Sequence, residues 1–325
     1  MLRRLKLAAL LLAGLAAAGS ALAQTGVPFP NRPLKIIVPF PAGGPVDLSA
    51  RTLAQKLTGA LGQSVVVDNR AGAATIIGTD AVAKAPADGY TWLITTNTIV
   101  INPSVYRKLP YDTLADLLPV MHISSSPFIL IAHPSLPVRG VADFVKFAKT
   151  RPGELLYSSS GVGSANHLPV SLMNIMAGIN TTHVPYKGTV PSLGAVVSGE
   201  VHFQFSNPIA SSALVRAGKL RALGTGGMRR LPTMPELPTI TESGIPGFEA
   251  GAWFGLFAPA AIPRDIVKRV HGDTANILAM PEVRQTLSAA GAELVADMPE
   301  QFTAFVKSEI AKWAKVVAFA GVKAD

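Results

Sequence analysis

The sequence predicts an α/β protein of two lobes, each built on a mainly parallel sheet with helices on both faces. Short apolar runs alternate with segments whose apolar residues recur at helical spacing, first over residues 33–96 and again from residue 128 onward. This alternation of strand and helix is typical of parallel sheets covered by helices. The chain has 325 residues, more than one typical core accommodates, which favours two lobes over one oversized domain.

The first 23 residues have the features of a cleavable export signal. Three basic residues among the first six precede an apolar run over residues 7–18, and Ala21-Leu22-Ala23 is a small-residue cleavage site. The run is too short to span a bilayer, and the sequence holds no cysteine to carry a lipid or form a disulfide. We therefore expect a mature chain that begins at Gln24 and is exported to the periplasm.

The net charge of the chain and the distribution of its basic residues indicate which kinds of molecule it can bind. Of the 29 lysines and arginines, three lie in the export signal, so the mature chain keeps 26 against 20 acidic residues, a formal surplus of +6. No run of five or six basic residues and no recognisable nucleic-acid module accompanies this surplus. We expect no nucleic-acid partner and interpret the charge as a general attraction for anions.

The first series of elements runs from residue 33 to about residue 96. A helix follows Gly44 and stops at Gly62. The expected strands cover residues 34–38, 64–67 and 91–95, and a second helix covers residues 75–84.

A second series begins after a loop around Asn102-Pro103. Its expected strands cover residues 128–132, 155–158, 183–184, 201–205 and 220–224, and its helices residues 141–149, 165–177, 191–198 and 209–217. Four prolines between residues 231 and 248 mark a crossing segment. We expect the last elements, a strand over 253–258 and helices over 264–280, 281–290 and 299–319, to pack back on the first lobe. Lobe 1 then comprises residues 24–124 and 250–325, and lobe 2 residues 125–249.

The turn after the first expected strand, Phe40-Pro41-Ala42-Gly43-Gly44-Pro45-Val46-Asp47, has the features of an anion site. Gly43 and Gly44 remove side chains that would keep a ligand from the backbone, and the following helix begins with amide hydrogens that lack partners. Ligands of parallel sheets lie beyond the carboxyl ends of the strands, where this turn falls. The alternative is a tight connection that binds nothing.

A second turn, Ser158-Ser159-Ser160-Gly161-Val162-Gly163-Ser164, repeats this chemistry. Its serine hydroxyls are extra donors, and Ser164 is the expected N-cap of the next helix. If the two turns lie on opposite lobes, both would hold a carboxylate in the cleft, and the lobes would close around it. The turn at residues 69–75 is also small and flexible and could line the same crevice.

Catalytic and metal chemistry find less support in the sequence. A serine of the second turn with His167 as its base would make a hydrolase, but the Gly-x-Ser-x-Gly elbow is missing, and His167 could equally be a structural residue. The six histidines show no pairing at metal-ligand spacing, so we expect no catalytic residue, no metal and no cofactor. Phe40, Tyr186 and Trp253 lie at expected strand ends, where aromatic side chains can wall a cleft.

Several motifs, taken in order along the chain, are those of a known family. They are P-L-K-I-I-V-P-F-P-A-G-G-P-V-D at residues 33–47, V-D-N-R-A-G-A at 67–73, A-K-A-P-A-D-G-Y-T at 83–91, L-P-Y-D at 109–112, the serine-glycine turn at 158–164 with His167-Leu168, and V-P-Y-K-G at 184–188. Through them, essentially the whole mature chain resembles the Bug (TctC-like) family, the periplasmic substrate-binding proteins of tripartite tricarboxylate transporters.

The resemblance implies a two-lobed, type II (Venus-flytrap) binding protein that captures a small organic carboxylate, delivers it to membrane subunits of such a transporter and is not an enzyme. We expect it to be a monomer. The resemblance also implies that the turns matching Phe40–Gly44 and Ser158–Ser164 hold the ligand carboxylate, largely through backbone amides and ordered water. The expected ligand-binding residues are Phe40, Ala42, Gly43, Gly44, Thr75, Ser159, Ser160, Gly161, Gly163, Ser164, His167, Tyr186, Ser206, Asn207 and Trp253.

Two positions depart from the family pattern. Members often carry Phe-Asp-Asn where this chain has Phe205-Ser206-Asn207, and that aspartate can pair with the ammonium of an amino-acid ligand. Because Ser206 has no charge, we expect a carboxylate without an amino group, such as an aliphatic dicarboxylate or an aromatic acid. Ala74-Thr75-Ile76 also replaces glycines and a polar residue that are common there. Two alternatives stay open, a ligand sensor that signals to a membrane partner and a secreted serine hydrolase.

Overall fold

The computed structural model describes residues 29–289 and 291–322, so the expected export signal at residues 1–23 lies outside the described residues. From Arg32 onward the chain forms two sheets flanked by helices, which confirms the α/β class. The six-stranded sheet consists, in spatial order, of β11 (Glu293–Leu294), β4 (Leu117–Pro127), β10 (Gly251–Pro259), β3 (Thr91–Thr96), β1 (Leu34–Val38) and β2 (Val65–Asn69). The five-stranded sheet consists of β7 (Thr182–Pro185), β6 (Leu156–Ser159), β8 (Phe203–Ser206), β5 (Ile129–Ala132) and β9 (Arg221–Thr225).

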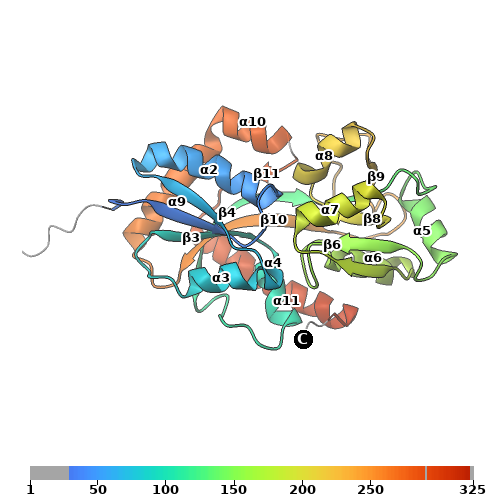
Figure 1. The fold of residues 1–325 in the computed structure, drawn as a ribbon, viewed down its shortest axis with the longest axis horizontal. Helices are drawn as coiled ribbons and strands as arrows, with labels where there is room; N and C mark the ends of the chain where they lie inside the picture. The colour runs from blue at the N-terminus through green and yellow to red at the C-terminus, as the bar shows by residue number, and fades with distance from the viewer. Residues whose placement is uncertain (1–28, 290, 323–325) are drawn as a thin grey trace, which may run out of the picture. The chain divides into compact units, whose positions relative to one another are not determined.

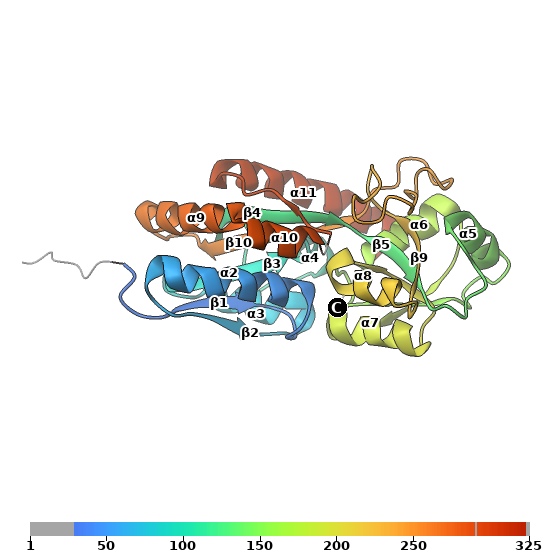
Figure 2. The same cartoon turned by 90° about the horizontal axis from the view of Figure 1, so that it is seen from above.

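Helices cover both faces of each sheet. Figure 1 shows one face of the six-stranded sheet beneath α2 (Pro45–Leu61), α9 (Arg264–Ala279) and α10 (Pro281–Ala289). The other face carries α3 (Ile76–Ala83), α4 (Thr98–Val105) and α11 (Pro299–Ala320). On the five-stranded sheet, α7 (Thr189–Ser198) and α8 (Pro208–Arg216) lie on one side, and α5 (Val141–Lys149) and α6 (Leu168–Ala177) on the other (Figure 2).

Helix α2 shows how local sequence positions the first turn. Its apolar residues, spaced three or four apart from Val46 to Leu61, are buried against the sheet. Pro45 occupies the first helical turn, where its missing N–H costs nothing, and Gly62 ends the helix with a left-handed φ of 66°. The helix therefore begins directly after Gly44 and fixes the turn that precedes it.

The sheets are mixed, which differs from the mainly parallel sheets expected. β1 pairs parallel with β2 and β3, and β6 pairs parallel with β7 and β8, as the strand-helix alternation requires. β10 pairs antiparallel with β3 and β4, and β5 pairs antiparallel with β8 and β9. These antiparallel pairs arise at β5 and β10, the strands with which the chain enters the five-stranded sheet and returns to the six-stranded sheet. Each of these strands runs opposite to its two neighbours.

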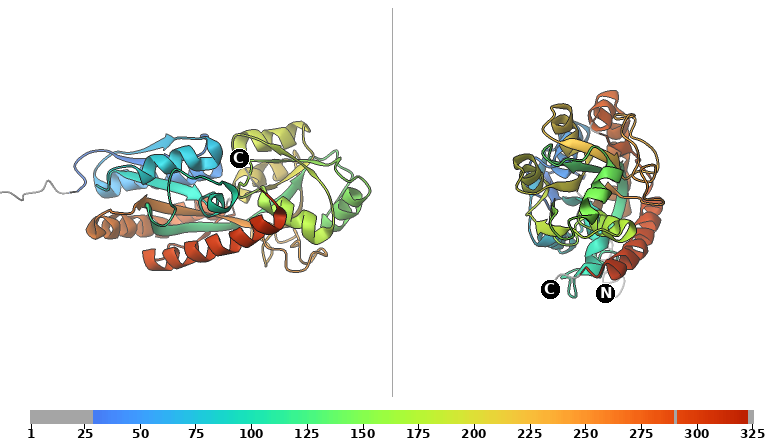
Figure 3. Two further views of the ribbon diagram at one scale, coloured as in Figure 1. Left: turned by 90° about the horizontal axis from the view of Figure 1, so that it is seen from below. Right: turned by 90° about the vertical axis from the view of Figure 1, so that its right-hand side faces the viewer.

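The chain crosses between the sheets at two adjacent places. Phe128 alone separates β4 from β5, and the return crossing joins β9 to β10. Backbone hydrogen bonds tie the crossings together: the Phe128 N–H donates to Ala250 O (3.0 Å), the Gly226 N–H to Phe128 O (2.7 Å), and the Ala250 N–H to Gly226 O (2.9 Å). Helix α11 also connects the two halves, since it contacts β4 and α4 and reaches α6 (Figure 3).

Several local expectations differ from the structure. The loop expected around Asn102-Pro103 is helix α4, because its apolar residues are fully buried and this burial outweighs the hydrogen bond that Pro103 cannot donate. Strands β4 and β11 were not expected. The helix expected from Ala165 begins at Leu168, with His167 rather than Ser164 at its N-cap position. The expected helix at 281–290 ends at Ala289, and residue 290 lies outside the described residues.

Candidate functional site

Turns from both sheets meet at one cavity of about 720 Å³, which we call the outer cavity. It lies beyond the carboxyl ends of β1, β2, β6 and β7, where ligands of parallel strands bind. Its walls are Pro39–Pro41, Ala71–Thr75, Ser160–Val162 and Tyr186–Gly188, together with Thr98, Tyr106 and Ser164.

A smaller cavity of about 40 Å³, the inner chamber, shares Phe40, Thr98 and Ser160 with the outer cavity. Its remaining walls come from both sheets and from the crossing at Phe128: Pro45, Val46, Thr96, Phe128, Ala165, Asn166, Thr189, Ser206, Asn207, Ala252 and Phe254. The two cavities therefore adjoin across these shared walls, and we treat them together as the candidate site.

Asp47 holds the turn after β1 in shape. Its Oδ2 accepts hydrogen bonds from the Gly43 N–H (2.8 Å) and from Arg51 Nε (2.9 Å), and its Oδ1 accepts from Asn69 Nδ2 (2.9 Å). Burial alone would raise the pKa of Asp47, but the hydrogen bonds from Arg51, Gly43 and Asn69 lower it below its ordinary value. The Gly43 amide is engaged by this carboxylate and Pro45 has no N–H, so the amides that follow at the start of α2 are the donors left for a ligand.

The turn after β2 has unusual backbone geometry. Ala73, Ala74 and Thr75 have φ values of +44°, +47° and +77°, a left-handed run of three residues without a glycine. The buried Asn102 of α4 supports the run, since its Nδ2 donates to Ala74 O (2.9 Å) and to Thr75 Oγ1 (3.4 Å). Strain of this kind persists where the surrounding structure fixes it, often at a ligand site.

Asn166 organises the serine-glycine turn after β6. Its Oδ1 accepts hydrogen bonds from Ser160 N (3.1 Å), Ser160 Oγ (2.9 Å) and Ser164 Oγ (3.0 Å). Ser164 Oγ also lies 2.6 Å from Gly161 O. Ser164 shares its one hydroxyl proton between Gly161 O and Asn166 Oδ1. Because the oxygen of Asn166 is occupied by Ser160 and Ser164, the amide hydrogens of Asn166 remain for other acceptors.

Two histidines stack beneath the same turn. The rings of His167 and His183 have centroids 4.0 Å apart, and His183 also stacks on Tyr157. Burial lowers the pKa of His167 to about 3, helped by the neighbouring His183, and lowers the pKa of His183 to about 4. Both rings are therefore neutral at neutral pH.

The contacts of these histidines bear on the hydrolase alternative. His167 Nδ1 accepts from the Gly163 N–H (3.1 Å), whereas His183 Nε2 lies 2.6 Å from Ser159 Oγ. Ser159 is fully buried and lines neither the outer cavity nor the inner chamber. A buried hydroxyl is poorly placed to attack a substrate, so the Ser159–His183 pair fits a structural role.

The walls of the site are almost uncharged. Lys187 is the one lysine, arginine, aspartate or glutamate among the described walls. Partial burial and the Glu200 carboxylate, which accepts from Tyr186 Oη (2.7 Å), raise the pKa of Tyr186 to about 12. No aspartate or glutamate lines the described part of either cavity. The site therefore favours an anion and offers no carboxylate to an ammonium group.

The structure distributes the fifteen sequence-predicted site residues among three places. Phe40, Thr75, Ser160, Gly161, Ser164 and Tyr186 line the outer cavity. Ser206 and Asn207, with Phe40 and Ser160, line the inner chamber. Lining neither are Ala42, Gly43, Gly44, Ser159, Gly163, His167 and Trp253, of which all but Trp253 belong to the two turns or to the residues that support them.

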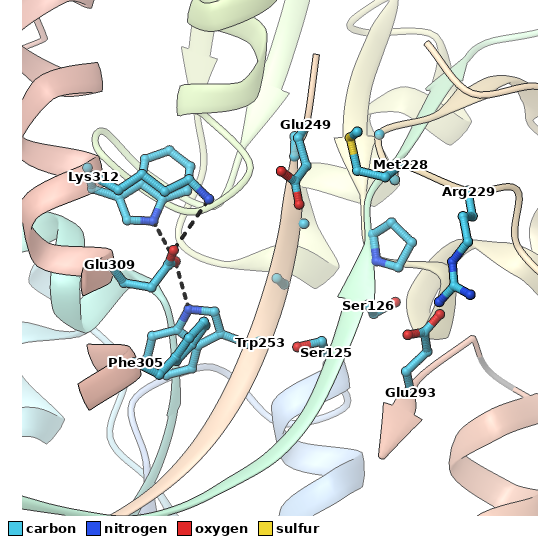
Figure 4. Close-up of a pocket in the computed structure, with 17 residues that line it drawn as sticks. Ser125, Ser126, Met228, Arg229, Glu249, Trp253, Glu293, Phe305, Glu309 and Lys312 are labelled. Atoms are coloured by element: carbon cyan, nitrogen blue, oxygen red, sulfur yellow. Dashed lines mark hydrogen bonds and ion pairs between the residues drawn. The ribbon is translucent and has the colours of Figure 1, made fainter. Parts of the chain in front are cut away.

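Trp253 lies in a different cavity, of about 330 Å³, between the crossing segments and α11. Its indole N–H donates to Glu309 Oε2 (3.1 Å), which also accepts from the indole of Trp313 (2.9 Å). Figure 4 shows this carboxylate pointing at the Trp253 indole, with Lys312 beside it.

Sequence reasoning missed several wall residues. Thr98 begins α4 and Tyr106 follows it, where a loop was expected, and Asn166 follows the serine-glycine turn. Lys187 and Gly188 lie in the V-P-Y-K-G motif, which was recognised although only Tyr186 was assigned a role. The strand-end position of that motif was the signal that could have identified them.

Two further searches cover the part of the chain that the structure describes. Within residues 29–289 and 291–322, no group of three or more histidine, aspartate or glutamate side chains is arranged to hold a metal ion. Over the same residues, no helix combines the length and apolar character needed to cross a bilayer.

Comparison of the sequence with known proteins identifies its relatives. A model of the family described as the tripartite tricarboxylate transporter family receptor (TctC) matches residues 49–322. Protein BugT of Bordetella pertussis is 36% identical over 311 residues, which cover 95% of this chain and 95% of that protein.

Two solved structures extend the similarity to the fold. An R. palustris protein with adipate is 40% identical with a TM-score of 0.89, covering 91% of this chain and 99% of that one. MatC from Rhodopseudomonas palustris with bound malate is 31% identical with a TM-score of 0.85, covering 89% of this chain and 100% of that one. The chain belongs to the Bug (TctC) family of tripartite tricarboxylate transporter receptors and has their two-lobed periplasmic solute-binding fold.

Proposed function

We propose that this protein captures a small organic acid without an amino group between its two lobes and delivers it to a membrane transporter of the tripartite tricarboxylate type. The observation that carries the proposal is the meeting of one strand-end turn from each sheet, at Phe40 and Ser160, on two adjoining cavities whose described walls include no aspartate or glutamate. The adipate and malate in the related structures, both dicarboxylates, support the same class of ligand.

The binding energy would come from several hydrogen bonds acting together. One helix N-terminus contributes about 0.3–1 kcal/mol, and about 2 kcal/mol when partly buried. Micromolar affinity needs about 8 kcal/mol, so the amides at the start of α2, the serine-glycine turn and Lys187 must act on the acid jointly. An amino group would lose its hydration without gaining a carboxylate partner, which disfavours amino acids.

The proposal includes how the molecule works as a whole. We infer that residues 24–124 with 250–325 form one lobe and residues 125–249 the other, and that the lobes close around the acid. The paired crossings at Phe128 and Ala250 lie close to these boundaries and support a hinge there. On this proposal the protein is exported by the signal at residues 1–23, acts as a monomer, needs no cofactor and releases its ligand unchanged.

A ligand screen on the mature chain from Gln24 tests the proposal. Adipate, malate and benzoate are compared with glutamate and aspartate by thermal shift and then by calorimetry. We expect an acid without an amino group to raise the melting temperature progressively, by the equivalent of about 2.7 kcal/mol at a hundredfold excess over Kd. No shift with any acid, or tighter binding of glutamate or aspartate, contradicts the proposal.

A pair of lysine variants locates the site. Lys187→Met removes the cationic wall of the outer cavity and should weaken the acid detected in the screen. Lys219→Met removes an exposed lysine that lines neither cavity and should leave binding unchanged. Equal affinities in the two variants would place the acid elsewhere.

NMR tests whether the protein changes its ligand. The spectrum of the acid after prolonged incubation with the protein should show no product.

A further inference from the structure

The side-chain amide of Asn207 has a fixed orientation at the inner chamber. Asn207 is the N-cap of α8, and its Oδ1 lies 2.9 Å from the backbone nitrogen of Ile209. A backbone N–H can only donate, so the atom that faces Ile209 must be the oxygen. The NH₂ group of Asn207 is therefore held on the other side of the amide.

This NH₂ group lacks a partner within the described chain. Asn207 is 5% exposed, and its Nδ2 is a buried atom without a hydrogen bond to any described residue. The residue lines the inner chamber, next to Ser206. A buried donor left unsatisfied costs free energy, and such groups are rare in folded proteins. Asn207 thus brings a buried, unsatisfied donor to the wall of the inner chamber.

The size and chemistry of the chamber define that acceptor. A volume of about 40 Å³ exceeds the roughly 10–15 Å³ that one water needs, but it is far too small for the body of an organic acid. Among its described walls no side chain is ionisable, and Asn166 is a second amide whose oxygen is already occupied. Only a terminal group fits, with the rest of the acid in the outer cavity.

We propose that Asn207 selects the end of the acid that enters the inner chamber, because its Nδ2 donates to a carboxylate or carbonyl oxygen there and cannot accept from an ammonium group. This inference rests on the proposed function and assigns its selectivity to one amide. An oxygen-ended group satisfies the fixed donor. An amino group in the same place leaves it unsatisfied and finds no negative partner.

The variant Asn207→Asp isolates this donor. Aspartate is as good an N-cap as asparagine, so the bond to the Ile209 N–H is kept, while the donor is replaced by a negative acceptor. Calorimetry is run with three pairs of acids that differ in one amino group: succinate and aspartate, glutarate and glutamate, adipate and 2-aminoadipate. We expect the wild type to prefer the member without the amino group. The variant should bind that member about tenfold to hundredfold more weakly, and its preference should move toward the amino acid by about tenfold or more.

Two control variants complete the experiment. Asn276→Asp makes the same change at an exposed position of α9 and should leave every affinity unchanged. If Asn207→Asp does not fold, Asn207→Ser serves instead, because serine also caps helices but lacks the amide; it should lose affinity for the member without the amino group and gain none for the other.

The outcomes separate the inference from the function on which it rests. If the wild type binds none of the six acids, the proposed function fails and the inference fails with it. If the wild type binds an acid and Asn207→Asp or Asn207→Ser binds it with the same affinity and preference, Asn207 is not the selecting group and the proposed function stands.

Discussion

The ring of Pro41 lies directly against Gly188, so close that a Cβ atom added to Gly188 would be 2.7 Å from the Cδ of Pro41. Pro41 follows β1 of the six-stranded sheet, and Gly188 precedes α7 beside the five-stranded sheet. Both residues line the outer cavity. The missing side chain at Gly188 therefore allows the two turns to approach each other at the site.

We predict that Gly188→Ala weakens binding of the acid that stabilises the wild type by about tenfold, equivalent to about 1.4 kcal/mol, because the methyl group holds the turns apart. The φ of +115° at Gly188 adds a folding cost of about 1 kcal/mol. Calorimetry measures the affinity, and Gly218→Ala is the control. Gly218 also has a positive φ, of +70°, but nothing lies within 4 Å of an added Cβ. Equal affinities in the two variants would rule out the contact with Pro41 as the cause.

Asp47→Asn should destabilise the fold by about 1–3 kcal/mol, because an amide cannot replace both carboxylate oxygens that accept from Gly43, Arg51 and Asn69. The pKa of Asp47 is lowered in the fold, so its contribution is complete above the ordinary value of 3.8 and is lost as pH falls through the lower folded value. Urea unfolding should show a constant gap between wild type and variant at neutral pH that narrows below pH 3.8.

Arg51→Ala provides the comparison for Asp47→Asn. The Arg51 side chain is 53% exposed, so its ion pair with Asp47 should contribute less than about 1 kcal/mol. A loss in Arg51→Ala as large as in Asp47→Asn would contradict the assignment of the stability to the buried hydrogen bonds.

Elements with strong local signals could be predicted from the sequence to the residue. β1 and α5 have the expected bounds, because an apolar run or an amphipathic repeat is bounded by clear breaking residues. β4 could not be predicted in this way. Its main partner is β10, with Ser125 opposite Trp253, and a strand that pairs across more than a hundred residues depends on contacts that no local pattern contains.

The same holds for the candidate site, where features local in the sequence were predicted and features that depend on tertiary contacts were not. The turns at Phe40 and Ser160 were predicted from glycines and hydroxyls at strand ends, which is local chemistry. Trp253 was assigned to the cleft as an aromatic residue at an expected strand end, whereas its indole N–H bonds to Glu309 on α11. The contact between Ser159 and His183 likewise depends on the neighbouring positions of β6 and β7, which only the folded sheet establishes.

Glu309→Ala should destabilise the protein by about 2–4 kcal/mol, because Trp253 and Trp313 would each keep a buried indole N–H without its acceptor. Glu309→Gln retains a side-chain oxygen that can accept from both indoles and loses only the half-exposed partner Lys312, so its cost should stay below about 1 kcal/mol. Chemical unfolding followed by tryptophan fluorescence measures both. Similar losses in the two variants would show that the charge, rather than the acceptor, stabilises the cluster.

Because of His122, we expect the free energy of unfolding to depend on pH between neutrality and about pH 4. Its ring is buried and stacks on Phe305, at 4.8 Å between centroids, and burial lowers its pKa from 6.5 to about 4 despite the nearby Glu309. The unfolded chain therefore takes up a proton first, and stability present above pH 6.5 is lost as pH falls toward 4. His122→Phe keeps an aromatic ring and removes the titration, so relative to wild type it should gain about 2–3 kcal/mol between pH 7 and pH 4. Urea unfolding at several pH values tests this, and curves that stay parallel would mean that His122 does not titrate on unfolding.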